Sequence, residues 1–339
     1  MKLATAKDLL NDELFLLEER LLDIIAGEFE LVNTMASRLV AAGGKRLRAI
    51  LVLLAARGGG EDGGPREKAV EVAAVCELVH LATLIHDDVI DQAATRRGVP
   101  TIHTDLGNQI TVLMGDHLYA RAIRHLITAT GRADLVRILA STVADLCEGE
   151  IRQLNETRWL GRVVRPDAGG GFAVRFEPME REYLEIIARK TAGFFGACGE
   201  MGALLVGEGE VVAGMRGYGF NLGMAFQITD DLMDYAGARE LTGKDEGNDL
   251  AAGRLTLPLI HALHHDEHGR ELLGLLSLSG GGLRKRVADL LDRTGSLGYA
   301  TQVARGYARR AREIALKHPH PEVGPVLVEL AESVLTRKV

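Results

Sequence analysis

The residues with the clearest chemical potential are six aspartates in two groups, each with the spacing Asp-Asp-x-x-Asp. The groups are Asp87, Asp88 and Asp91, and Asp230, Asp231 and Asp234. Residues four apart share a helix face, so each group places its carboxylates at one helical level. Apolar neighbours such as Leu84, Ile85 and Leu232 surround them, and carboxylates in such surroundings repel one another and resist desolvation. A divalent cation would relieve both costs, and carboxylates that bridge a metal to phosphate favour Mg²⁺. We therefore predict that all six aspartates are metal ligands.

Each group alone is a weak signal, because a solvated acidic helix face or a helix end produces the same pattern. Two copies in apolar helices, far apart in the sequence, are not explained in that way. A purely structural helical protein would have no reason to bury six aspartates in two matching groups. The pair therefore favours a site at which both groups face one apolar hollow, with divalent ions between them.

Cationic side chains occur where they could complete such a site. Lys45 and Arg48 lie at the start of a predicted helix, where the helix N-terminus and cationic side chains both favour phosphate. His80 precedes Asp87 by two helical turns on the same face. Other candidate cations follow the aspartate groups or open an apolar stretch: Arg96, Arg97, Lys190 and Lys244. Surface cations are common and a lone histidine is more often structural, so only their combination with the aspartates predicts a diphosphate site.

Composition narrows the class of protein. Hydrophobic residues make up 47% of the 339 residues and aromatic residues only 4%, which suits packed helices better than strands. The net charge of −7 offers no basic surface for nucleic acid. No apolar run approaches a membrane span, and the first thirty residues lack a signal-peptide pattern, so we expect a cytoplasmic protein without stable membrane insertion. Three scattered cysteines, Cys76, Cys147 and Cys198, suit neither a disulfide framework nor a zinc site.

Helical periodicity dominates the chain, and no segment has the convincing alternation of a strand. It predicts helices over residues 9–40, 46–56, 69–91, 110–130, 133–154, 180–205, 211–235 and 283–339. No linker separates two independently patterned halves. We therefore predict one all-α domain over residues 1–339, a large helical bundle, with an insertion or mobile loop at about 157–178.

With these motifs the chain resembles the all-trans polyprenyl diphosphate synthases, and in particular the long-chain, octaprenyl-type members. The resemblance extends from about residue 39 to residue 263, and its motifs occur in the family's order. They are Gly-Gly-Lys-Arg-Leu-Arg at 43–48, the first aspartate group, Arg96-Arg97-Gly98, Gly115-Asp116, Lys190-Thr191, Phe226-Gln227, the second aspartate group and Gly243-Lys244. The resemblance implies a helical bundle around a deep central cavity, usually a homodimer.

The resemblance also implies roles for individual residues. The six aspartates would engage about two or three Mg²⁺ ions per active site, directly or through water. Thr191 and Gln227 would line the reacting centre, together with Lys190. The cations that would hold the allylic diphosphate are Arg96, Lys190 and Lys244. Those that would hold isopentenyl diphosphate are Lys45, Arg48, His80 and Arg97.

The length of the product would depend on the residues below the first aspartate group. In the family, bulky aromatic residues at the positions of Ala82 and Thr83 block elongation. Both are small here, so the resemblance implies a long product of about six or more isoprene units. Two departures from the family pattern occur: Ala49 replaces the usual proline after Arg48, and Arg254 replaces a lysine. Arg254 keeps the charge for binding diphosphate but differs from lysine in geometry.

The implied reaction joins isopentenyl diphosphate to a farnesyl or geranylgeranyl diphosphate primer. Metal and cations would neutralise the departing diphosphate, the isopentenyl double bond would attack the allylic cation, and a proton would then be lost. The released diphosphate would accept that proton. Apolar walls would keep water from the cation.

Other functions fit the sequence less well. A short-chain geranylgeranyl or farnesyl diphosphate synthase stays open as the nearest alternative. A class I terpene cyclase would need neither Lys45, Arg48 nor Arg97. A metal phosphohydrolase, suggested by His86-Asp87, would leave the second aspartate group unexplained. A non-catalytic subunit of a heteromeric prenyl synthase would tend to lose the acidic motifs, and this chain keeps both.

Overall fold

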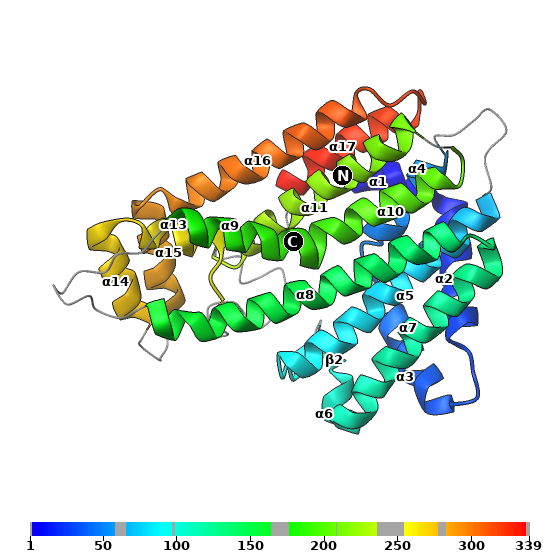
Figure 1. Cartoon of the computed structure of the whole chain (residues 1–339), viewed down its shortest axis with the longest axis horizontal. Coiled ribbons are helices and arrows are strands. Elements are labelled where there is room, and N and C mark those ends of the chain that lie inside the picture. The colour runs from blue at the N-terminus through cyan, green and yellow to red at the C-terminus, as the bar shows by residue number, and fades with distance from the viewer. Residues whose placement is uncertain are drawn as a thin grey trace.

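The structure is a computed structural model that describes residues 2–57, 66–96, 99–163, 176–207, 209–235, 254–276 and 283–336. Within these ranges the chain is helical, apart from short connections and one ribbon of two short strands (Figure 1). This confirms the all-α fold class predicted from the sequence.

The described helices follow one another along the chain with short connections or undescribed segments between them. The first half of the chain contains α1 (Lys2–Leu9), α2 (Asn11–Ile25), α3 (Glu30–Ala41), α4 (Leu47–Arg57), α5 (Arg66–Ile90), α6 (Ile102–Leu106), α7 (Asn108–Thr130) and α8 (Ala133–Val163). The second half contains α9 (Phe176–Ile187), the π-helix η1 (Ala188–Ala192), α10 (Gly193–Leu204), α11 (Glu210–Met233), α13 (Leu257–Leu263), α14 (Asp266–Leu276), α15 (Leu283–Arg293), α16 (Ser296–Ala315) and α17 (Val323–Leu335). Strands β1 (Thr95–Arg96) and β2 (Val99–Pro100) pair in antiparallel register, Thr95 with Pro100 and Arg96 with Val99.

Several local features differ from the sequence predictions, among them the π-helix η1 within the predicted helix 180–205 and the unpredicted helices α6, α13 and α14. The stretch 9–40 is not one helix, because breaks near Leu10 and at 26–29 divide it among α1, α2 and α3. The strands of the ribbon have two residues each, too few to show an alternating pattern. Both ends of the predicted loop at 157–178 are helical, since α8 continues to Val163 and α9 begins at Phe176. Residues 164–175 lie outside the described part of the chain.

Helices α4, α5, α10 and α11 form the centre of the packing. Helix α4 packs on α5 and α10, while α10 packs in turn on α11, and α11 on α16. Helix α4 is buried from Ala49 to Ala56, and α5 is buried on most sides between Ala69 and Ile85, as expected of helices that are apolar all round. By length and composition α5 could also cross a membrane, but 72% of its most apolar window is buried inside the protein. Its hydropathy is therefore that of a core helix.

Helix α11 links two apolar clusters. Its earlier residues, Met215 and Leu222 among them, pack with α4, α5 and α10. Its later residues Met224 and Ile228 pack with α9, α13 and α16. Buried Tyr218 also donates a hydrogen bond to the carbonyl of Leu327 at 2.7 Å, which ties α11 to α17. These contacts fix the C-terminal end of α11, which carries the second aspartate group.

Candidate active site

Both aspartate groups lie at the C-terminal ends of long buried helices, the first on α5 and the second on α11. The helix dipole places partial negative charge at this end, so carboxylates there are electrostatically unfavourable. Asp88 and Asp231 are moreover buried, at 4% and 6% exposure. Such an arrangement requires compensating positive charge or hydrogen-bond donors, and the surrounding elements provide both.

Two arginines from outside α5 compensate the first group. The Nε and Nη2 atoms of Arg96 each lie 2.8 Å from Oδ1 of Asp88, and the β1–β2 ribbon holds Arg96 in place. Burial raises the pKa of Asp88, and the charge of Arg96 partly opposes this. Arg254 forms an ion pair with Asp91 across 163 residues of sequence. Through this pair, the segment that precedes α13 reaches the first aspartate group.

Burial and neighbouring acidic groups disfavour the charged form of Asp87. Burial raises its pKa to about 6, and Glu150 and Asp91 add to the increase, while the positive charges of Lys190 and Arg96 oppose it. Several acidic groups therefore act on one another near Asp87. This is the environment that a divalent cation would relieve.

The π-helix η1 brings Lys190 to this region. Lys190 forms an ion pair with Glu150, and its Nζ donates a hydrogen bond to Oε1 of Gln153 at 2.5 Å. The approach of η1 to α8 requires Gly149, because a Cβ atom there would lie 2.8 Å from Cγ of Lys190. Sequence analysis missed Glu150 and Gln153. The signal was their spacing of three on one helix face, directly after a glycine.

Hydrogen bonds from residues of α9 and α11 hold Asp231 of the second aspartate group. Asp231 accepts hydrogen bonds from the hydroxyl of Tyr183 at 2.6 Å and from Nε2 of Gln227 at 2.8 Å. Oε1 of Gln227 accepts a hydrogen bond from Oγ1 of Thr191 at 2.8 Å. Close packing of η1 on α11 depends on Gly223, where a Cβ atom would lie 2.6 Å from Cα of Ala192. Adjacent residues of η1 thus interact with the two groups, Lys190 with Asp87 and Thr191 with Asp231 through Gln227.

The candidates for isopentenyl diphosphate lie farther back, around α4 and the middle of α5. Arg48 is held over the rings of Phe194 and Phe195, with 5.0 and 4.9 Å from its guanidinium carbon to the ring centroids. Burial lowers the pKa of Arg48, and the charge of Glu77 is the largest opposing influence. Lys45 is exposed, and His80 lies on α5. Two predicted diphosphate ligands, Arg97 and Lys244, fall outside the described residues.

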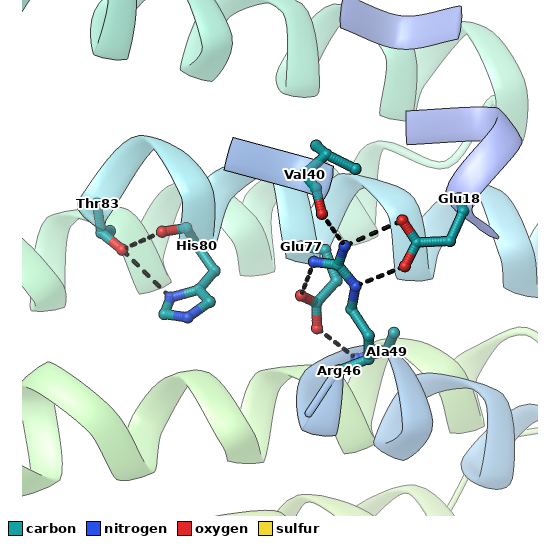
Figure 2. A network of polar contacts seen from close by, with 7 residues as sticks. All are labelled: Glu18, Val40, Arg46, Ala49, Glu77, His80 and Thr83. Carbon is teal, nitrogen blue, oxygen red and sulfur yellow. Dashed lines mark hydrogen bonds and ion pairs between the residues drawn. The ribbon is translucent and has the colours of Figure 1, made fainter. Parts of the chain in front are cut away.

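The two predicted chain-length residues differ in burial. Ala82 is fully buried at 0% exposure. Thr83 is partly exposed, and its Oγ1 donates a hydrogen bond to the carbonyl oxygen of His80 at 2.7 Å (Figure 2). A larger side chain at Ala82 would therefore enter the packed core, whereas one at Thr83 need not.

The described residues contain no ready-made cluster of three or more His, Cys, Asp or Glu side chains able to hold a metal. Arg96, Arg254 and Tyr183 are partners of Asp88, Asp91 and Asp231 instead. The donor set still fits Mg²⁺, because hard carboxylate oxygens gather at two helix ends, and burial together with the charges of acidic neighbours raises the pKa of Asp87. Metal binding would require some of these carboxylates to exchange their partners. The roles of the six aspartates in binding metal stay a prediction.

The raised pKa of Asp87 predicts how stability depends on pH in metal-free buffer. Between about pH 4 and pH 6 the folded state binds more protons at Asp87 than the unfolded state does, so the free energy of unfolding should fall as pH rises through this window. Above pH 6 the loss should reach about 2–3 kcal/mol. Denaturant unfolding with EDTA should show Asp87→Asn to be more stable than wild type at pH 7.5, with the difference disappearing near pH 4. An equal difference at both pH values would contradict the shift.

The helical fold and the site of mixed acidic and basic side chains are those of an all-α transferase of the isoprenoid synthase type. The chain belongs to the polyprenyl synthetase family, whose family model matches residues 29–291. Within that family it is a trans-prenyltransferase of the polyprenyl diphosphate synthase kind. The family resemblance seen in the sequence is thereby confirmed.

Individual relatives cover most of the chain. Octaprenyl diphosphate synthase of Escherichia coli is 33% identical over 98% of this chain and 97% of that protein. Heptaprenyl diphosphate synthase component 2 of Geobacillus stearothermophilus is 39% identical over 78% of this chain and 76% of that protein. A polyprenyl synthase from Caulobacter crescentus, solved in complex with calcium and isoprenyl diphosphate, has a TM-score of 0.85 and 31% identity. The structural alignment covers 99% of this chain and 98% of the Caulobacter chain.

Proposed function

We propose that this enzyme condenses isopentenyl diphosphate with a farnesyl or geranylgeranyl primer to make a long-chain all-trans polyprenyl diphosphate. The observation that carries this proposal is that adjacent residues of η1 interact with both aspartate groups. The positive charge of Lys190 opposes the increase in the pKa of Asp87. Thr191 donates a hydrogen bond to Gln227, and Gln227 donates one to Asp231. A single substrate bound at η1 could thus be reached from both groups. The similarity to octaprenyl diphosphate synthase and the small side chains at Ala82 and Thr83 support a long product.

The proposed chemistry assigns distinct tasks to the chain's own residues. The six aspartates would hold Mg²⁺, which supplies electrostatic stabilisation of the departing diphosphate. Lys190 and Arg96 would bind the allylic diphosphate, and Arg254, which pairs with Asp91, would reach the same group. Lys45 and Arg48 would orient isopentenyl diphosphate.

A single assay tests the proposal. Purified protein, Mg²⁺ and labelled isopentenyl diphosphate are incubated with farnesyl or geranylgeranyl diphosphate, and the products are sized by chromatography. We expect products of about six or more isoprene units and no product after EDTA treatment. Products that stop at farnesyl or geranylgeranyl diphosphate would support the short-chain alternative. Failure to incorporate label with every primer would overturn the proposal.

We also propose that the chain acts as a homodimer that uses one face of α7. Five large apolar side chains on that face are exposed: Ile110 at 42%, Val112 at 41%, Leu113 at 67%, Ile123 at 37% and Ile127 at 40%. They fall within one arc of the helix, opposite the buried residues Met114, Leu118 and Leu126. An apolar helix face of this kind is typical of a protein interface. The similarity to heptaprenyl synthase component 2 raises the alternative of a different partner chain.

Substitution on this face should dissociate the dimer. We expect Leu113→Glu combined with Ile127→Glu to convert a wild-type dimer into a monomer, because two charges would enter an apolar contact. Sedimentation velocity on the purified chain measures this directly. Leu316→Glu is the matched control, since Leu316 is 60% exposed on a different helix end and should leave the dimer intact. A monomeric wild type that acquires activity only with a second, different chain would favour the heteromeric alternative.

A further inference from the structure

The segment at 43–48 contains two arginines, and their environments differ sharply. Arg46 is fully engaged: its Nε and Nη2 atoms bind the carboxylate of Glu18 at 2.8 and 3.0 Å, and Nη2 also donates to the carbonyl of Val40 at 3.1 Å. Its Nη1 lies 3.5 Å from Oε2 of Glu77 (Figure 2). One guanidinium thus joins α2, the end of α3, the start of α4 and α5.

Arg48 has none of these contacts. Among the residues that the structure describes, it makes no hydrogen bond or ion pair, and its buried Nε atom has no acceptor. Its guanidinium instead stacks over Phe194 and Phe195. The two arginines of the motif therefore differ in their partners: two carboxylates hold Arg46, whereas Arg48 has no carboxylate partner within hydrogen-bond distance among the described residues.

The contacts of Arg46 hold an unusual backbone conformation at the same residue. Its φ of +52° is in the left-handed region, which is unfavourable for a residue other than glycine. This conformation lies directly between Lys45 and the start of α4, so it sets the direction in which the segment enters the helix. Strained backbone of this kind persists only where the surrounding contacts hold it, and the guanidinium supplies several.

Glu77 completes the support from α5. Its side chain is 5% exposed, and Oε1 accepts a hydrogen bond from the backbone N–H of Ala49 at 3.1 Å (Figure 2). This bond satisfies one of the N–H groups that the first turn of a helix leaves without a partner. The same carboxylate therefore fixes Arg46 on one side and the helix turn that carries Arg48 on the other.

We propose that Arg46, anchored by Glu18 and Glu77, is a positioning residue for the isopentenyl diphosphate site. It fixes the backbone so that Lys45 is exposed and the guanidinium of Arg48 stays available to a diphosphate. This inference rests on the proposed function, and it predicts an effect on the binding of isopentenyl diphosphate but not of the allylic diphosphate. Glu77 precedes Asp87 by ten residues, about 15 Å along α5, so the anchor is remote from the aspartates proposed for the allylic diphosphate.

The test compares Arg46→Lys with a matched control, Arg57→Lys. Arg57 also ties α4 to the preceding helices, through the carbonyl of Leu9 at 3.2 Å and Glu13 at 3.5 Å, but it lies in the last turn of α4. Lysine keeps the charge of Arg46 and loses the planar, multiple hydrogen bonds. We expect Arg46→Lys to raise KM for isopentenyl diphosphate about tenfold or more, with kcat and the KM of the primer changed less than about threefold. Arg57→Lys should leave all three near wild type.

A second variant and a binding measurement keep the result decisive if Arg46→Lys folds poorly. Glu18 has a side chain that is 44% exposed, so Glu18→Gln should fold, and it removes one carboxylate from the anchor. It should raise KM for isopentenyl diphosphate selectively, by about threefold. Calorimetric titration with isopentenyl diphosphate should show the same weakening without turnover.

Two outcomes would overturn the positioning role. In the first, Arg46→Lys and Glu18→Gln lower only the thermal midpoint, with KM for isopentenyl diphosphate unchanged. In the second, Arg57→Lys raises that KM to the same extent. Failure of the proposed function would look different, because the wild-type enzyme would then form no prenyl product.

Discussion

Replacing Asp87 or Asp230 by asparagine is expected to lower kcat by about a hundredfold or more while the protein stays folded. Asparagine keeps the shape of the side chain and removes the charge with which it would hold a cation beside the diphosphate. At Asp87 the fold itself should tolerate the change, because burial already favours the neutral carboxyl and raises its pKa to about 6. Steady-state turnover with saturating substrates measures kcat, and circular dichroism checks the fold.

The control for this experiment is Asp289→Asn. Asp289 is an exposed aspartate on α15, outside both groups, and its replacement should leave turnover near wild type. Near-normal turnover in both Asp87→Asn and Asp230→Asn would refute the proposed roles of the two groups. A loss at one group only would mean that the second group does not act on the same diphosphate.

The long periodic helices and the aspartate motifs were predictable because their signals are local. Helices α5 and α11 are apolar over many turns, and each aspartate group lies within two turns of sequence. The shorter features were not predictable in this way. A four-residue break between α2 and α3 leaves the surrounding periodicity almost intact, and the π-helical turn η1 has no sequence signature distinct from an α-helix.

The partners of the site residues were harder still, because they depend on tertiary contacts. The pair between Arg254 and Asp91 joins positions 163 residues apart, and no local pattern connects them. Glu150 and Gln153 reach Lys190 only because Gly149 allows η1 to pack closely on α8. Sequence analysis could name charged residues in the correct motifs, but it could not say which carboxylate each cation compensates.

The same limit applies to the two arginines at 43–48. Their types and their shared motif suggest similar roles, and only Arg48 was predicted to bind substrate. The carboxylates that distinguish them, Glu18 and Glu77, come from α2 and α5, on either side of the motif in the sequence. A cation's availability to substrate is therefore a property of its neighbours and not of the motif.

Thr83→Phe is expected to shorten the main product to about four isoprene units or fewer. Thr83 lies one helical turn, about 6 Å, before Asp87 on α5, along the proposed path of the growing chain. It is partly exposed, so a phenyl ring there need not enter the packed core, and on the proposed path it would obstruct the growing chain. Chromatographic sizing of the products, with the primer and Mg²⁺ concentrations held constant, measures the change.

The choice of Thr83 over Ala82 follows from burial. Ala82 is 0% exposed, and forcing a phenyl ring into such a position costs about 1–3 kcal/mol or more through overpacking, so a shorter product there could reflect a disturbed fold. Thr83→Val separates bulk from hydrogen bonding, because valine keeps the size of threonine and loses the bond to the carbonyl of His80. If bulk controls length, Thr83→Val should give the wild-type product and Thr83→Phe a shorter one. Unchanged length in Thr83→Phe would place the path of the growing chain elsewhere, and shortening in both variants would assign the effect to the hydrogen bond.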